Sequence, residues 1–240
     1  MNYKLKLHRD DDPPDPREND NLGRMVCFHP RYNLGDEQPR VSPDEWLRDL
    51  ACELDETLAD RLDYWENGNG WQALANKADA MGNRHAWRLA DEKIEAAVQK
   101  VLDARAVMLP LYLYDHSGLS MSTGGFSCPW DSGQVGYIYA SREDVLKEYG
   151  GKKLTAATRQ RAVSLLKAEV EEYDHFLRGD AWGWAVYEVD DECDCEPDEE
   201  CSCTRHAYCE DSCWGYLGSE AALEDGKASL EWLEKDKESE

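Results

Sequence analysis

Basic residues are scarce in this sequence of 240 residues. Lys and Arg together number 27, against 51 Asp and Glu, which gives a formal net charge of -24 at pH 7. A chain with this charge repels nucleic acid and anionic membrane surfaces at ordinary salt. The composition therefore argues against direct nucleic-acid binding, and it favours a basic protein surface or a cation as the partner.

Long hydrophobic runs are also absent. No stretch approaches the roughly 18 apolar residues of a membrane span, and residues 1–6 contain no apolar signal-peptide core. We therefore expect no membrane association and a location in the cytoplasm of a host cell. Hydrophobic residues still make up 41% of the chain, so the sequence can fill a core in spite of its charge.

The pattern of apolar residues predicts an α+β fold. Runs typical of strands occur at 3–8, 24–32, 107–114, 135–140, 181–189 and 212–217. Helical spacing occurs at 42–66, 71–106, 141–150, 155–178 and 220–234. Because the strands come in pairs, we expect an antiparallel or mixed sheet with helices packed mainly on one face. Residues 1–240 are predicted to form a single domain, with a charged tail at 235–240.

The helix expected at 42–66 has the clearest charge pattern. Ser42 is a favourable N-cap, and Pro43 stands at the first helical position. Leu and Trp recur at spacings of three and four on one face, and acids occupy the other. Four of these acids lie away from the apolar face and are our candidates for binding a partner: Asp49, Glu53, Asp60 and Asp63.

Six cysteines follow the strand expected at 181–189, and the last of them falls in the strand expected at 212–217. They are Cys193, Cys195, Cys201, Cys203, Cys209 and Cys213. Thiolates in a reducing compartment select zinc or a similar ion. We expect residues 190–213 to form an acidic hairpin insertion held by structural zinc, because the segment has almost no apolar residues of its own. Disulfides and free thiols are the alternatives, and a catalytic metal is not expected in a thiol-rich site.

A Gly/Ser-rich loop at 115–132 holds side chains from which a catalytic site could be built. Cys128 is the candidate nucleophile, His116 its base, and Asp131 the acid that orients the imidazole. Single Cys and His residues beside strands are more often packing or turn residues. The glycines of this loop are not followed by Gly-Lys-Ser/Thr, which excludes a phosphate-binding P-loop.

Two stretches of the sequence resemble a known family. One is DNLGRMVCFHPRYNLGD at 20–36, and the other joins LPLYLYDHSG at 109–118 to FSCPWDSGQVGYIY at 126–139. Together they resemble a family of uncharacterised proteins encoded by tailed bacteriophages, prophages and related viruses. The resemblance implies a viral accessory origin and no particular chemistry.

Three functions are compatible with these features. The first is an acidic viral accessory protein that binds a basic host protein, such as a nucleic-acid-binding defence factor, and inhibits or redirects it by imitating DNA. Duplex DNA carries one negative charge per roughly 1.7 Å of its axis, a density that a carboxylate-rich helix face approximates. A Cys/His-dependent enzyme centred on 115–131 and a zinc-stapled structural protein are the alternatives. Salt adaptation would explain the acidity without a partner, but the twelve lysines show no depletion of lysine.

Overall fold

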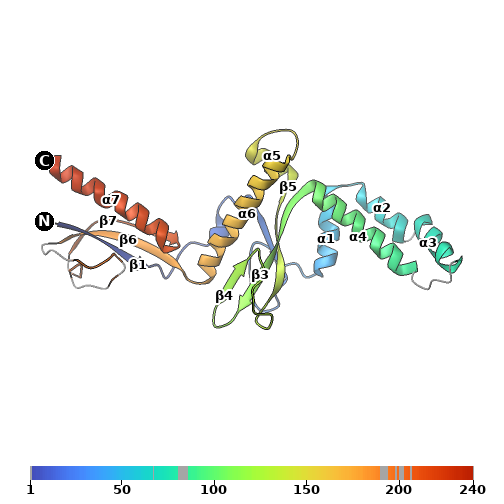
Figure 1. Ribbon diagram of the computed structural model, residues 1–240, viewed down its shortest axis with the longest axis horizontal. Helices are drawn as coiled ribbons and strands as arrows, with labels where there is room; N and C mark the ends of the chain where they lie inside the picture. The colour runs from blue at the N-terminus through green and yellow to red at the C-terminus, as the bar shows by residue number, and fades with distance from the viewer. Residues whose placement is uncertain are drawn as a thin grey trace.

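Two antiparallel sheets organise the chain. The computed structural model describes residues 2–66, 68–80, 86–189, 194–197, 199, 203–205 and 207–239. One sheet has three strands in the order β1-β6-β7, and the other has four in the order β2-β5-β3-β4 (Figure 1). Both ends of the chain lie at the three-stranded sheet (Figure 1). The predicted α+β fold with antiparallel pairing is confirmed, although the strands divide between two sheets.

The four-stranded sheet lies at the centre of the molecule. Its strands are β2 (Arg24–Cys27), β3 (Ala106–Asp115), β4 (Leu119–Ser122) and β5 (Ser132–Ser141). The sequence did not predict β4, which lies in the expected loop and pairs with β3 only over its last four residues. Pro110 therefore lies where the outer edge of β3 has no strand partner among the described residues, a position at which a sheet tolerates proline.

Helices cover both faces of this sheet. They are α1 (Pro43–Leu54), α2 (Leu58–Glu66) and α4 (Ala86–Arg105) on one face and α5 (Arg142–Tyr149) and α6 (Ala156–Leu177) on the other, while α3 (Asn69–Ala80) packs against α2 and α4. Neighbouring residues of β2 point to opposite faces, so Met25 packs in the core under α5 and α6, and Val26 packs in the core under α1, α2 and α4. The expected arrangement had helices mainly on one face. No helix in the described part of the chain has the length and hydrophobicity needed to cross a bilayer.

The helix expected at 42–66 is divided in two. α1 ends at Leu54, and α2 begins at Leu58. Asp55 between them is extended, with φ -144° and ψ 96°, and its side chain accepts hydrogen bonds from the Thr57 amide and hydroxyl at 3.2 and 2.8 Å. This local bond offers the backbone an alternative to the helix. The apolar spacing continues through the break, which is why periodicity alone did not reveal it.

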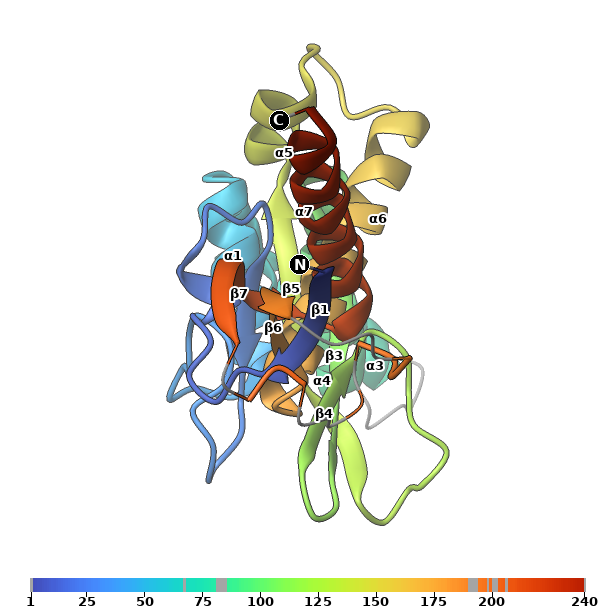
Figure 2. The ribbon, with the colours of Figure 1, turned by 90° about the vertical axis from the view of Figure 1, so that its left-hand side faces the viewer.

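The three-stranded sheet packs against the last helix. Its strands are β1 (Asn2–Arg9), β6 (Ala181–Val189) and β7 (Tyr208–Leu217), and α7 (Ser219–Ser239) runs along one face around Leu5, Trp184 and Val186 (Figure 2). The predicted pairing of the two strands around the Cys-rich segment is confirmed. Because β7 begins at Tyr208, the last residues of the expected insertion at 190–213 belong to the sheet. α7 ends at Ser239 and therefore includes most of the charged tail expected at 235–240.

Candidate functional site

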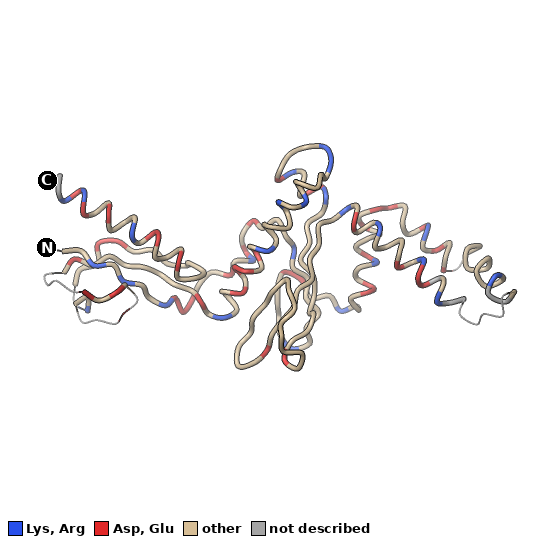
Figure 3. The backbone as a smooth tube through the Cα atoms, viewed as in Figure 1, with Lys and Arg blue, Asp and Glu red and all other residues tan. Residues whose placement is uncertain are grey.

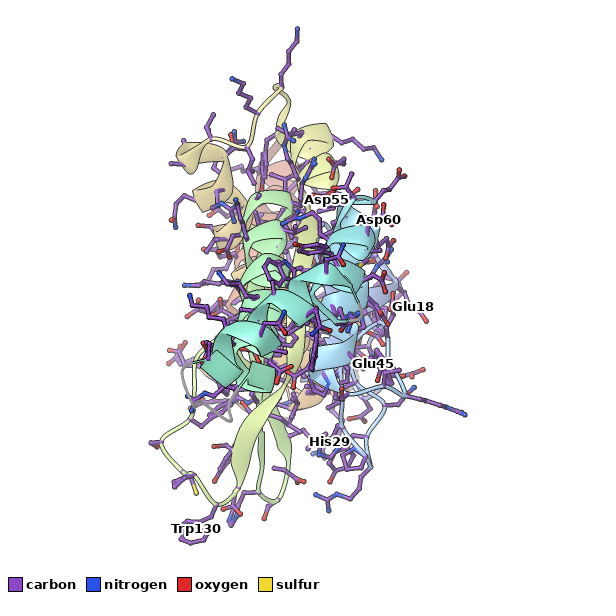
Figure 4. The ribbon with its side chains drawn as sticks, turned by 90° about the vertical axis from the view of Figure 1, so that its right-hand side faces the viewer. Glu18, His29, Glu45, Asp55, Asp60 and Trp130 are labelled. Carbon is purple, nitrogen blue, oxygen red and sulfur yellow. The ribbon has the colours of Figure 1, made fainter. Side chains whose placement is uncertain are left out.

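The acids that we predicted to bind a partner lie on the outer surface of α1 and α2. Asp49, Glu53, Asp60 and Asp63 are all exposed, and the leucines that alternate with them, such as Leu50 and Leu62, are buried. Figure 4 shows Glu18, Glu45, Asp55 and Asp60 along one side of the molecule. The break between the two helices therefore leaves the charged face intact. We call the exposed surface around Asp49, Glu53, Asp60 and Asp63 the acidic face.

The acidic face keeps most of its charge. Within the residues that the structure describes, Asp49, Glu53 and Asp60 form no ion pair. Two nearby arginines are already paired with other acids: Arg48 with Glu66 and Arg24 with Glu37. Figure 3 shows Lys and Arg at the turn between α5 and α6 and also on α1 and α2, where Arg61 follows Asp60 directly in the sequence. The three carboxylates are therefore available to a basic partner.

A polar cavity of about 680 Å³ adjoins the acidic face, between α1, α5 and the loop at 19–23. Its lining includes Glu53, Glu143 and Glu148, with Arg24 and Lys147 among the basic groups. In the described part of the molecule, every buried side-chain nitrogen or oxygen has a hydrogen-bond partner. The cavity thus extends the acidic surface inward without presenting an unsatisfied buried group to a ligand.

An ion network forms the wall of this cavity. The short 3₁₀ helix η1 (Pro16–Glu18) carries Arg17, whose guanidinium makes two bonds of 2.9 and 2.8 Å to Asp36 and a longer contact of 3.4 Å to Glu169. Glu169 also accepts from the backbone N–H groups of Leu22 at 2.9 Å and Gly23 at 3.0 Å. Burial raises the pKa of Glu169, against the opposing effects of Arg17 and the two amides.

This network is structural rather than catalytic, because each of its charges is satisfied within the fold. It ties η1 and the loop at 19–23 to α6, and it fixes Asp36, which accepts a bond of 2.7 Å from the Met25 amide of β2. Sequence analysis missed it, because Arg17 lies between the strands expected at 3–8 and 24–32, where no helix or strand was predicted. The only signal was that Leu22, Gly23 and Asp36 belong to one of the two family-like stretches.

The structure brings the three candidate catalytic residues together. One carboxylate oxygen of Asp131 lies 3.2 Å from Nδ1 of His116 and 3.5 Å from Sγ of Cys128. The thiol therefore donates to the carboxylate. In an activated nucleophile the imidazole accepts the thiol proton and the carboxylate orients the imidazole from behind. Asp131 contacts both side chains, but the thiol bonds to the carboxylate and not to the imidazole, which is not the order that this mechanism needs, and the His116 side chain is 62% exposed.

The two family-like stretches meet beside these residues. Asp115 accepts from Arg31 at 2.6 Å and from the Tyr32 hydroxyl at 3.4 Å, which joins the loop after β2 to the end of β3. Trp130 stands beyond them with 92% of its surface exposed, at the tip of the loop in Figure 4. The two stretches therefore lie in one part of the structure, the strands β2, β5 and β3 and their loops.

The Cys-rich segment is described only in part. Cys193 and Cys201 lie outside the described residues, Cys203 forms a disulfide, and Cys195, Cys209 and Cys213 form none. The Cys195 sulfur accepts a bond of 3.0 Å from the ammonium of Lys6, which is buried. Among the described residues, no three His, Cys, Asp or Glu side chains are placed to hold a metal. A disulfide sulfur cannot supply a thiolate ligand, so the predicted set of six ligands cannot include Cys203 in this state, and binding of structural zinc by the other cysteines stays a prediction.

The chain matches no protein-family model, no curated protein and no solved structure.

Proposed function

We propose that this protein is a viral accessory protein that binds a basic, nucleic-acid-binding host protein and inhibits or redirects it. The observation that carries the proposal is the acidic face, where Asp49, Glu53 and Asp60 are exposed and form no ion pair with any described residue. Exposed carboxylates that are not held in ion pairs attract a basic surface over long range and speed its association. The viral origin rests on the resemblance of the stretches at 20–36 and 109–139.

The acidic face would act by imitating the charge of DNA. Residues three or four apart on a helix have their Cβ atoms about 5–6 Å apart, so Asp49 with Glu53, and Asp60 with Asp63, form closely spaced pairs of charges. A groove that binds the phosphate backbone would accept such a surface in place of nucleic acid. The protein would therefore compete with nucleic acid for its partner, and it would not bind nucleic acid itself.

Reversal of four charges on the acidic face tests the proposal. We expect Asp49→Lys, Glu53→Lys, Asp60→Lys and Asp63→Lys, combined in one protein, to abolish capture of basic host proteins in a pull-down. The fold should survive because all four side chains are exposed. Capture by the wild type should weaken as salt rises from 50 to 500 mM, since the Debye length falls to a few Å.

The matched control reverses Glu220, Glu224, Glu231 and Glu234 on α7, which are also exposed and change the net charge equally. This control should retain capture. Equal loss in both variants would mean that only net charge matters. Full inhibitory activity of the acidic-face variant in a phage-fitness assay would overturn the proposal and leave the acidity as solvation.

A second candidate function is a Cys/His-dependent enzyme, and the contacts of Asp131 with both His116 and Cys128 favour it. This function requires a thiol that the imidazole activates after a local rearrangement. If it holds, Cys128 reacts with iodoacetamide at least tenfold faster than the exposed Cys209, and His116→Ala removes that difference. Mass spectrometry of the labelled peptides measures both rates in one sample. Equal rates would reject the enzyme.

A further inference from the structure

A groove with an apolar floor and an acidic rim runs between α1 and α4. Its volume is about 910 Å³. The floor is formed by Leu47 of α1 and by Ile94, Val98 and Leu102 of α4. The rim carries carboxylates from both helices and from the end of α2: Asp44, Glu45, Glu66, Asp91, Glu92 and Glu95. We call this feature the α1–α4 groove. It lies on the α4 side of α1, whereas the polar cavity lies on the side of β2 and α5.

The rim has an excess of negative charge. Glu66 pairs with Arg48 and Glu92 with Arg88, at 2.7 and 3.2 Å. The other four rim acids, Asp44, Glu45, Asp91 and Glu95, are exposed and form no ion pair with any residue that the structure describes. The two lysines of α4 are not part of the lining. Figure 3 shows that α4 carries both acidic and basic residues, so the negative excess belongs to the rim of the groove and not to the whole helix. A basic occupant would neutralise this rim, and an acidic one would be repelled.

The floor has the length of a short helix. Ile94, Val98 and Leu102 are each four residues apart, so they form one row along α4 of about 12 Å at 1.5 Å per residue. Ile94 and Leu47 are partly exposed, so part of the floor is open to an apolar side chain. An amphipathic helix that enters a groove presents anchors at i, i+3 or i+4, and i+7, which span about the same distance.

We propose that the α1–α4 groove binds a basic amphipathic helix of the partner protein. This inference rests on the proposed function and gives its partner a structural class. Apolar anchors of the helix would lie on Leu47 and Ile94, the partly exposed part of the floor, and flanking Lys or Arg would pair with the rim. The acidic face accounts for long-range attraction, while the apolar floor accounts for an affinity that persists when salt screens the charges.

A pair of synthetic peptides tests the groove in the full-length protein. The first is a fluorescent 16-residue helix with Leu at positions 5, 8, 9 and 12 and Lys or Ala elsewhere. The second has the same composition, with the Leu residues moved to disperse them around the helix. We expect the first peptide to bind at least tenfold more tightly than the second, as measured by fluorescence anisotropy at 300 mM salt. The two peptides carry the same net charge, so only the apolar stripe differs between them.

Two tryptophan substitutions locate the binding site. Ala96 lines the groove and is exposed, so Ala96→Trp fills it without entering the core. Ala104 is exposed on the same helix and does not line the groove, which makes Ala104→Trp the matched control. Ala96→Trp should weaken binding of the amphipathic peptide at least tenfold, and Ala104→Trp should leave it unchanged. Circular dichroism should show the same helix content in all three proteins.

The outcomes separate this inference from the proposed function. If both peptides bind equally and Ala96→Trp has no effect, the groove is rejected, and salt-sensitive capture by the acidic face still stands. If the groove binds the peptide but the four-fold reversal on α1 and α2 leaves host capture intact, the acidic face fails and the groove stands. A wild-type dimer that Ala96→Trp converts to a monomer would mean that a second copy of this chain fills the groove, which would overturn the proposal.

Discussion

Replacement of Glu169 with alanine is expected to lower the free energy of unfolding by about 3–5 kcal/mol, because removal of one member of a buried ion pair leaves the other charge uncompensated. The Glu169 side chain is only 6% exposed. Its loss leaves the amides of Leu22 and Gly23 without their acceptor and removes one of the two carboxylates around Arg17. Since about 2–4 °C of melting temperature corresponds to each kcal/mol at this chain length, we expect a decrease of roughly 10 °C.

Thermal unfolding followed by circular dichroism measures this effect. Two control variants show whether the effect comes from the buried contacts of Glu169. Glu169→Gln keeps one carbonyl acceptor for the two amides and should cost clearly less than alanine. Glu172→Ala changes an exposed residue of the same helix and should stay within about 0.5 kcal/mol of the wild type. A Glu169→Ala protein as stable as the Glu172→Ala control would show that the network does not hold η1 and the loop at 19–23 in place.

Elements with a strong period were predictable from the sequence. Thr155 was expected to start a helix, and its hydroxyl does accept from the Thr158 amide at the start of α6. The strand predicted at 181–189 coincides with β6. In both cases the local sequence preferences and the apolar pattern favour the same secondary structure, and the packing of the folded protein agrees with them.

Elements set by long-range contacts were not predictable. β1 does not pair with β2, the next strand in the chain. It pairs instead with β6, more than 170 residues later, and this pairing divides the strands between two sheets. Periodicity reports which residues are buried and does not report which strand covers them. The four residues of β4 are too short to show a period, and only their pairing with the end of β3 makes them a strand.

The candidate site was predictable in part. The exposure of Asp49, Glu53, Asp60 and Asp63 followed from the helical period, because each lies off the apolar row. His116, Asp131 and Cys128 were candidates chosen from one loop, and the sequence could not show whether or in what order they meet; in the structure Asp131 contacts both His116 and Cys128. The α1–α4 groove could not be predicted, since Leu47 and Val98 are more than 50 residues apart and the groove exists only where their helices pack.

The second large effect is expected at Gly136, where β5 passes closest to β2. A Cβ atom built on Gly136 would lie 1.9 Å from the carbonyl oxygen of Val26 and 3.0 Å from Cα of Cys27. Both neighbours are backbone atoms, so relief requires β2 to move away from β5. A glycine inside a strand often marks such a close approach. We expect Gly136→Ala to cost at least about 3 kcal/mol, at or above the upper part of the range for overpacked cores.

The movement of β2 would extend beyond the strand, because β2 leads into the segment that carries Arg31 and Asp36. We therefore expect Gly136→Ala to lower the melting temperature by roughly 6–12 °C and to loosen the contact of Arg31 with Asp115, measurable as faster amide hydrogen exchange at 28–36. Gly133→Ala is the matched control, since it lies on the same strand with no atom within 4 Å of its added Cβ and without a positive φ. It should be neutral or slightly stabilising, because alanine restricts the unfolded chain. Equal stability of the two variants would show that β2 and β5 can separate without cost, and the junction of the two family-like stretches would then not depend on this glycine.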